Sequence, residues 1–318
     1  MTLAKELTCA IDEWLAAGDL SSRTQAQYRW HLLAGDVSLA RWLEQEGVEG
    51  LAGLSRARLA FWRRQLLERY APTTANQAIS AARGLVKWME AENAQQLRFD
   101  LPGPLADVLK PPRIPVTPQE TVLPDEYEAL LSSLSAGTAK GVRDRALLTM
   151  LYETGMRSCE FVALQTGDLR LDNRHGWALV RSRKGGDVGE VVFGAVCRDR
   201  LCRWLDVRRS ESSALWVGVA PPFAGLPMTQ NGLRTTICKW CAGAGLRRLS
   251  PHDFRRGAAL FHLKHATSRE WVLRQFGWSD DSMYRHYTQA LPLHEFDTAN
   301  SIVDRLSAAP PRQLPLFD

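Results

Sequence analysis

Proline clustering divides this chain more clearly than any other feature. Seven of the 16 prolines in the 318 residues fall between positions 102 and 124. Proline has no backbone N–H and a fixed φ, so neither a helix nor a central strand runs through such a segment. The cluster therefore predicts a linker between two units. The expected boundaries are 1–100 for the first domain, 101–117 for the linker, 118–295 for the second domain and 296–318 for a C-terminal helix and extended tail.

The first domain shows helical periodicity throughout. Apolar residues recur every three or four positions, and Ser or Thr stands near most of the starts, in the segments 3–18, 21–47, 55–70 and 73–93. This spacing is typical of amphipathic helices. It predicts a small all-helical domain.

The second domain combines helices with one hairpin. Helical patterns cover 124–134, 141–155, 198–209, 231–245, 254–265 and 268–277. Between them, two β-rich runs flank the turn Lys184-Gly185-Gly186-Asp187 within 177–193, which predicts a small antiparallel sheet. The expected fold class is mainly α, with two domains.

Net charge and hydropathy indicate the kind of partner and the cell compartment to expect. The formal net charge is +5 and the pI about 9.0, which favours a polyanionic partner without establishing one. No apolar run is long enough to span a bilayer, and the first residues carry acidic side chains, unlike a signal peptide. We therefore expect a cytoplasmic protein with no membrane partner.

Two pairs of residues have the spacing of metal ligands. Cys238 and Cys241 form a C-x-x-C pair, but the other four cysteines provide no second pair of this kind. His262 and His265 stand three residues apart without a matching carboxylate. Both patterns are more typical of core or surface residues than of a zinc site, so we expect reduced thiols and no metal.

Polar groups able to bind phosphate or transfer protons cluster where the periodic patterns break. Taken singly, each has an ordinary structural explanation; Arg157, for example, could pair with Glu160, and Lys184 could be a solvated turn residue. Together they form an ordered set of candidates: Arg157, Lys184, His252, Arg255, Trp278 and Tyr287. Breaks in a scaffold are where proteins present reactive side chains.

The same positions carry a family resemblance. The motifs "TGMRSCE", "RKGG", "SPHDFRRG" and "FGWSDDSMYRHY" resemble, in order and spacing, those of the tyrosine recombinases, or phage integrase family. "APTTANQAISAARGLVKWME" is similar to the last major helix of that family's N-terminal domain, so the resemblance covers roughly residues 3 to 290. The family's nucleophile follows the His or Trp of the final motif by nine positions. That implies Tyr287 rather than Tyr284, since 287 − 278 = 9.

The resemblance implies a fold and an activity. It implies a SAM-like, core-binding helical domain followed by a catalytic domain. It also implies cleavage and rejoining of DNA through a 3′-phosphotyrosine intermediate and a Holliday junction. The implied partners are double-stranded DNA and a tetramer on it, either of this chain alone or with a second recombinase. No cofactor is implied. Arg83 and Lys87, on the helix before the linker, are the candidate DNA contacts in the first domain.

The implied roles agree with the chemistry of the side chains. Arg157 and Arg255 are suited to two-point contact with the non-bridging phosphate oxygens. His252 is the candidate base for the tyrosine proton and Lys184 the candidate acid for the departing 5′ oxygen. Trp278 stands where His is commoner and offers an indole N–H as a donor.

Two other functions fit the same motifs. A type IB topoisomerase uses the same residue types to nick and reseal one duplex, without the contacts that exchange strands between partners. A DNA-binding accessory protein without catalysis fits the basic composition, although all six catalytic positions are filled.

The C-terminal tail suggests a further partner. Gln313, Leu314, Leu316 and Phe317 lie in "QLPLF", which is similar to peptides by which bacterial replication and repair proteins dock on the DNA sliding clamp. Prolines keep such a segment extended, and its apolar side chains can anchor it in a groove. The alternative is a tail that packs on its own chain or on a neighbouring protomer.

Overall fold

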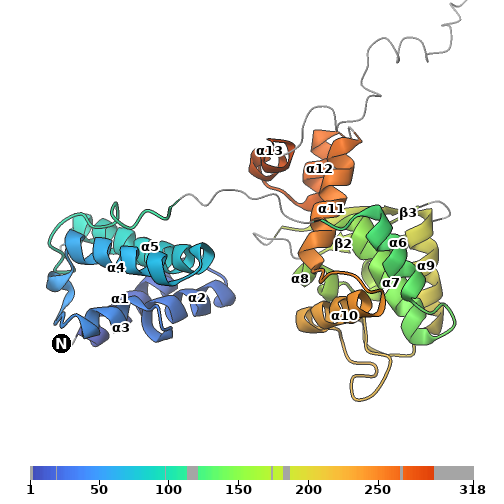
Figure 1. The fold of residues 1–318 in the computed structure, drawn as a ribbon, viewed down its shortest axis with the longest axis horizontal. Helices are drawn as coiled ribbons and strands as arrows, with labels where there is room; N and C mark the ends of the chain where they lie inside the picture. The colour runs from blue at the N-terminus through green and yellow to red at the C-terminus, as the bar shows by residue number, and fades with distance from the viewer. Residues whose placement is uncertain are drawn as a thin grey trace, which may run out of the picture. The chain divides into compact units, whose positions relative to one another are not determined.

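The computed structural model describes residues 3–18, 20–96, 98–112, 121–172, 175–181, 187–265 and 268–289 (Figure 1). The chain divides into two compact units, Met1–Thr117 and Pro118–Asp318. Among the described segments, none of the helices is both long enough and apolar enough to cross a membrane.

The first unit is built from helices. They are α1 (Leu3–Ala17), α2 (Ser22–Arg29), a π-helix (Trp30–Ala34), α3 (Leu39–Gln45), a short 3₁₀ turn (Leu51–Gly53), α4 (Arg56–Arg69) and α5 (Pro72–Gln96). Their apolar stripes meet in one core that includes Ile11, Leu43, Trp62, Ile79 and Leu85. Helix α4 begins where the Ser55 side chain accepts a hydrogen bond from the Arg58 N–H at 3.2 Å, a standard N-cap.

The long periodic segment 21–47 contains two α-helices rather than one. Helix α2 passes into the π-helix, which ends at Gly35, and α3 starts four residues later. The Trp30 ring lies over Gly35, where an added Cβ would come within 3.0 Å of it. Periodicity alone did not show this break, because apolar residues continue on both sides of it.

Part of the expected linker packs on the first unit. Leu105 and Leu109 are buried in its core. The Glu90 carboxylate accepts the backbone N–H groups of Leu105 and Ala106, the latter at 2.9 Å. Residues 101–112 therefore belong structurally to the helical unit, and the sequence that follows them, 113–120, lies outside the described residues.

The second unit surrounds the largely buried helix α7. Its helices are α6 (Pro124–Ser133), α7 (Ala139–Thr154), α8 (Ser158–Ala163), a 3₁₀ turn (Thr166–Asp168), α9 (Ala195–Val207), α10 (Gln230–Gly243), α11 (Pro251–Lys264), α12 (Arg269–Phe276) and α13 (Asp281–Gln289). Its strands are β1 (Leu169–Leu171), β2 (His175–Val180) and β3 (Gly189–Gly194).

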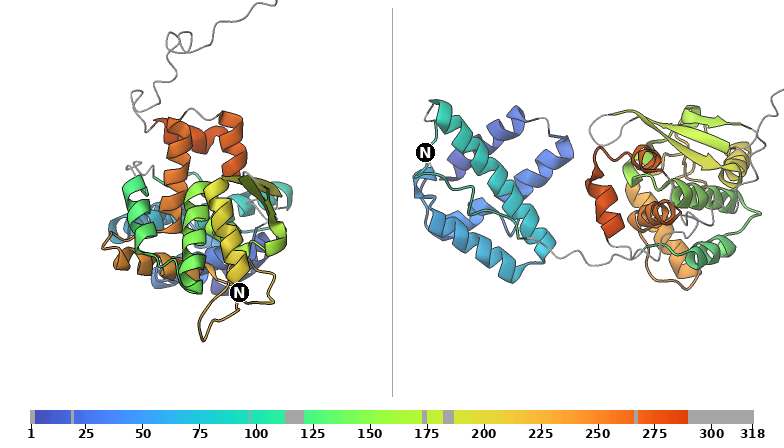
Figure 2. Two further views of the ribbon diagram at one scale, coloured as in Figure 1. Left: turned by 90° about the vertical axis from the view of Figure 1, so that its right-hand side faces the viewer. Right: turned by 90° about the horizontal axis from the view of Figure 1, so that it is seen from above.

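The three strands form one antiparallel sheet in the order β1-β2-β3. One face, with Ala178, Val180, Val191 and Phe193, is buried against α7 and α9, and α12 lies against β3 (Figure 2). The predicted fold class, mainly α with a small antiparallel sheet, is confirmed. The short strand β1 is an addition that the sequence did not indicate.

Candidate active site

Arg157 stands between two helices. Helix α7 ends at Gly155, which adopts the left-handed conformation with φ of 56°, and α8 begins directly after Arg157. The Arg157 backbone N–H and Nη1 donate to the two carboxylate oxygens of Glu160 at 3.1 and 2.8 Å. The Glu160 side chain is only 4% exposed, so this pair restricts the conformation of the Arg157 side chain. The remaining terminal nitrogen, Nη2, donates to the Gly277 carbonyl at 3.2 Å.

Arg255 lies on α11 and is buried, with 4% exposure. Its Nη1 donates to the Gly155 carbonyl at 2.8 Å and its Nη2 to the Phe276 carbonyl at 2.6 Å. The guanidinium also lies 5.4 Å from the centre of the Phe276 ring. The structure therefore brings Arg157 and Arg255 to neighbouring carbonyls at the C-terminal end of α12.

His252 occupies the first turn of α11, three residues before Arg255. Although the residue keeps contact with solvent, partial burial of its ring lowers its pKa. Positive charges lower the pKa further, namely those of Arg256, Arg255 and Arg157. The imidazole is therefore neutral near pH 7 and able to accept a proton.

Trp278 follows the left-handed Gly277 that ends α12. Its ring is buried, at 8% exposure, and stacks on Phe276 with centroids 5.2 Å apart. Tyr284 packs against the same apolar cluster, which also contains Ala258 of α11. Trp278 is thus packed directly beside the carbonyls that hold the two arginines.

Tyr287 belongs to α13, which packs against α11 and α12. An ion pair between Asp281 and Arg269 joins the first turns of α13 and α12. The side chain of Tyr287 lies outside the described part of the structure, and so does Lys184, in the chain between β2 and β3. The helix expected to carry the nucleophile therefore packs against α11, which carries Arg255, and against α12.

The spaced histidines and cysteines have ordinary surroundings in the fold. His262 packs against the Trp271 ring, 4.5 Å between centroids, and burial, with a smaller contribution from His265, lowers its pKa to about 4. His265 bonds the Phe261 carbonyl through Nδ1 at 2.8 Å. Cys241 is buried in the core and Cys238 half-buried. Over the described residues, no three His, Cys, Asp or Glu side chains gather as a metal site would require.

The two candidate DNA contacts of the first unit differ in their surroundings. Lys87 is exposed on α5. Arg83 is half-buried, and its Nε donates to the Ala106 carbonyl at 3.3 Å. Arg83 therefore also holds the segment after α5 in place.

One residue of this site escaped the sequence analysis. Gln275 is buried on α12 between Val192 of β3 and the arginine-binding carbonyls. The sequence signal is a polar residue within an apolar stripe. Gln275 follows Val272 by three positions and directly precedes Phe276. A single polar residue in such a stripe is easily taken for a boundary of the apolar face.

Two guanidinium groups, an imidazole and an indole gather around the C-terminal end of α12, and the helix that carries Tyr287 packs against α11 and α12. Comparison with known proteins gives the family. Residues 120–294 match the model of the "Phage integrase family". The chain is also 30% identical over 295 residues to tyrosine recombinase XerD of Xanthomonas campestris pv. campestris, covering 89% of this chain and 87% of that protein. The chain belongs to the phage integrase family and is a tyrosine-type site-specific DNA recombinase.

Solved structures share its fold. The XerH site-specific recombinase bound to difH substrate, in a pre-cleavage complex, matches with a TM-score of 0.65 at 20% identity, over 88% of this chain and 81% of that one. A lambda integrase tetramer bound to a Holliday junction matches with a TM-score of 0.66 at 12% identity, over 89% and 79%. At these identities the likeness concerns the fold.

Proposed function

We propose that this recombinase cuts DNA with Tyr287. The phenol oxygen attacks the scissile phosphorus, forming a Tyr–phosphate ester, and the bond from phosphorus to the 5′ oxygen breaks. His252 takes the phenol proton, and Lys184 gives one to the departing 5′ oxygen. A 5′ hydroxyl later reverses the step, so the phosphodiester is restored without a nucleotide cofactor.

Arg157 and Arg255 stabilise the charge that gathers on the non-bridging oxygens in the transition state. The observation that carries this proposal is their convergence on the carbonyls of Phe276 and Gly277, beside α13. Trp278 supplies a donor and a packed wall at the same place. Each of these roles requires the side chain to face one phosphate.

The assembly follows from the proposed chemistry. Exchanging strands between two duplexes through a Holliday junction requires four cleavages, so we propose a tetramer on double-stranded DNA, of this chain alone or with a second recombinase. Arg83 and Lys87 contact DNA phosphates from the first unit. The protein acts in the cytoplasm, at the nucleoid, in integration, excision or resolution of mobile-element or replicon DNA.

Covalent trapping tests the proposal. The full chain is incubated with genomic fragments of its source organism, and the DNA ends attached to protein are sequenced, which also maps the cleavage site. Tyr287→Phe should bind DNA but form no adduct, whereas Tyr284→Phe, three residues earlier in the same helix, should still form it. Adducts that persist in Tyr287→Phe would refute the nucleophile. Joining of two separate duplexes would distinguish a recombinase from an enzyme that nicks and reseals one duplex.

We also propose that the tail binds the sliding clamp. Gln313 and Leu314 set the register of the peptide, and Leu316 and Phe317 provide the apolar anchors. The double variant Leu316→Ala with Phe317→Ala should lose clamp association in a pull-down yet cleave naked DNA at the unchanged rate. If the wild type shows no affinity for the clamp and the double variant loses cooperative assembly on DNA, the tail is instead a protomer-docking element.

A further inference from the structure

The outer edge of the sheet carries an unusual contact. Strand β3 is an edge strand, and its Val192 stands opposite Trp177 of β2. In an antiparallel pair, alternate residues direct both their N–H and their C=O toward the partner strand or away from it. Val192 directs both groups away from β2, toward α12.

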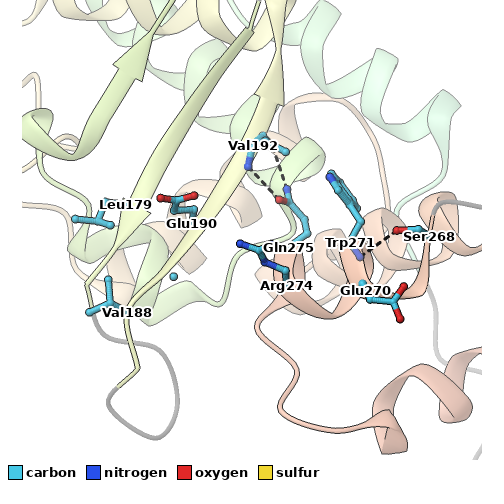
Figure 3. Close-up of a pocket in the computed structure, with 10 residues that line it drawn as sticks. Leu179, Val188, Glu190, Val192, Ser268, Glu270, Trp271, Arg274 and Gln275 are labelled. Atoms are coloured by element: carbon cyan, nitrogen blue, oxygen red, sulfur yellow. Dashed lines mark hydrogen bonds between the residues drawn. The ribbon is translucent and has the colours of Figure 1, made fainter.

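A single side chain pairs with both of these groups. The Val192 N–H donates to Oε1 of Gln275 at 3.0 Å, and Nε2 of Gln275 donates to the Val192 carbonyl at 2.9 Å (Figure 3). The Gln275 amide thereby continues the hydrogen bonding of the sheet onto a helix. Gln275 is only 5% exposed, so removing these partners would leave a largely buried amide without them, which is costly.

The bridge stands at the border of an open space between the sheet and the helix. A cavity of about 690 Å³, lined by both β3 and α12, lies beside the bridge. Leu179 and Val188 line its sheet side, and Trp271 and Glu270 its helix side (Figure 3). The amide bridge therefore joins the last turn of α12 to β3 beside this cavity, in addition to the apolar packing of Val272 and Phe276.

The residues directly after Gln275 hold the arginines. The Phe276 carbonyl accepts from Arg255 and the Gly277 carbonyl from Arg157. A displacement of the end of α12 would move both acceptors together, and with them the direction of both guanidinium groups. Misplacing a catalytic group by about 1 Å can slow a reaction about 10²-fold.

We propose that Gln275 is a positioning residue for the arginine pair. Its amide holds the last turn of α12 against the edge of β3, so that the following carbonyls orient Arg157 and Arg255 toward the scissile phosphate. This role rests on the proposed function of those arginines. It adds to that function a requirement for a residue that does not contact DNA.

A charge-neutral substrate separates positioning from folding. In a methylphosphonate, a methyl group replaces one non-bridging oxygen, so the scissile group carries no formal charge for the arginines to neutralise. We would measure single-turnover cleavage of a nicked duplex bearing the mapped site, with either phosphate or methylphosphonate. Gln275→Leu keeps the approximate size but removes both bonds. Glu270→Gln, exposed on the same helix and beside the same cavity, is the matched control.

Gln275→Leu should slow cleavage of the phosphate about 10- to 10²-fold, and this deficit should shrink on the methylphosphonate, as the deficit of Arg157→Ala should. Glu270→Gln should resemble the wild type on both substrates. An equal deficit of Gln275→Leu on both substrates overturns the proposal, because it shows a general loss of structure. If the deficit of Arg157→Ala is also equal on the phosphate and the methylphosphonate, the proposed role of the arginines fails. The positioning role of Gln275 then fails with it.

A second variant, Gln275→Glu, tests the same role through its pH dependence. In Gln275→Glu, the protonated carboxyl can accept from the Val192 N–H and donate to its carbonyl, whereas the carboxylate can only accept. Cleavage relative to wild type should therefore recover as the pH falls, while Gln275→Leu should show no such recovery. A constant ratio of Gln275→Glu to wild type across the pH range would contradict the positioning role.

Discussion

Replacing Gly155 by alanine should damage both stability and cleavage. Gly155 has φ of 56°, and an added Cβ would lie 2.6 Å from Cε1 of Phe276 and 3.0 Å from Cβ of Ala258. The left-handed conformation costs a non-glycine residue about 1 to 2 kcal/mol, and overpacking a buried site costs about 1 to 3 kcal/mol more. We therefore expect Gly155→Ala to lower the free energy of unfolding by about 2 to 5 kcal/mol.

Gly245 provides the matched control. It has φ of 67°, also left-handed, but no atom lies within 4 Å of an added Cβ. Gly245→Ala should therefore lose only the conformational part, about 1 to 2 kcal/mol. Equilibrium urea unfolding of the full chain, followed by circular dichroism, measures both variants against wild type. Equal losses in the two variants would refute the steric argument.

The functional part follows from the same contacts. Phe276 and Ala258 flank Arg255, whose Nη1 bonds the Gly155 carbonyl itself. Pushing these groups apart should slow covalent adduct formation by Gly155→Ala even under conditions in which the protein stays folded. Gly245→Ala should cleave at the wild-type rate, because Gly245 lies beyond the end of α10, away from these contacts.

Three further predictions concern the site and the DNA. Arg157→Ala and Arg255→Ala should each slow cleavage by about 10²-fold or more in single-turnover assays, with much smaller losses of binding. Because the pKa of His252 is lowered, its imidazole stays neutral around neutral pH. The loss of cleavage caused by its protonation should therefore appear only at pH values below the ordinary histidine pKa. A His252→Gln variant should lack this decrease at acidic pH. Finally, the logarithm of the DNA-binding constant should fall with the logarithm of the salt concentration less steeply for a fragment of residues 118–318 than for the full chain. Equal slopes would mean that the helical unit does not hold DNA.

The sequence predicted six helices of the second unit, which carry strong local signals, but it did not indicate the short helices α8 and α13. The apolar stripe of 141–155 ends in a glycine that takes the left-handed cap, and α7 ends at that glycine. The structure brings Arg157 and Arg255 together, and His252 and Trp278 lie beside them. These are the residues that the family motifs singled out. Motif order carried this information, since nothing in the local periodicity indicates which helix ends meet.

The contacts that sequence analysis missed are those between distant segments. Strand β1 is three residues long and is recognisable only by its pairing with β2. Leu105 and Leu109 lie among prolines, yet both are buried, and Glu90 of α5 accepts the backbone N–H groups of Leu105 and Ala106. The bridge from Gln275 to Val192 spans 83 residues. A local pattern records which residues prefer burial, but not the partner that accepts a buried polar group.

The positive charges of the arginine pair also act on His252. In the proposed mechanism, positive charges on Arg157 and Arg255 stabilise the negative charge of a phosphate in the transition state, and the same charges, after burial, lower the pKa of the imidazole. A base with a lowered pKa is available as neutral imidazole at the pH of the cell, although it is intrinsically weaker. In the proposed mechanism, the two arginines held by carbonyls at the end of α12 would thus both stabilise the transition state and keep His252 ready to accept the phenol proton.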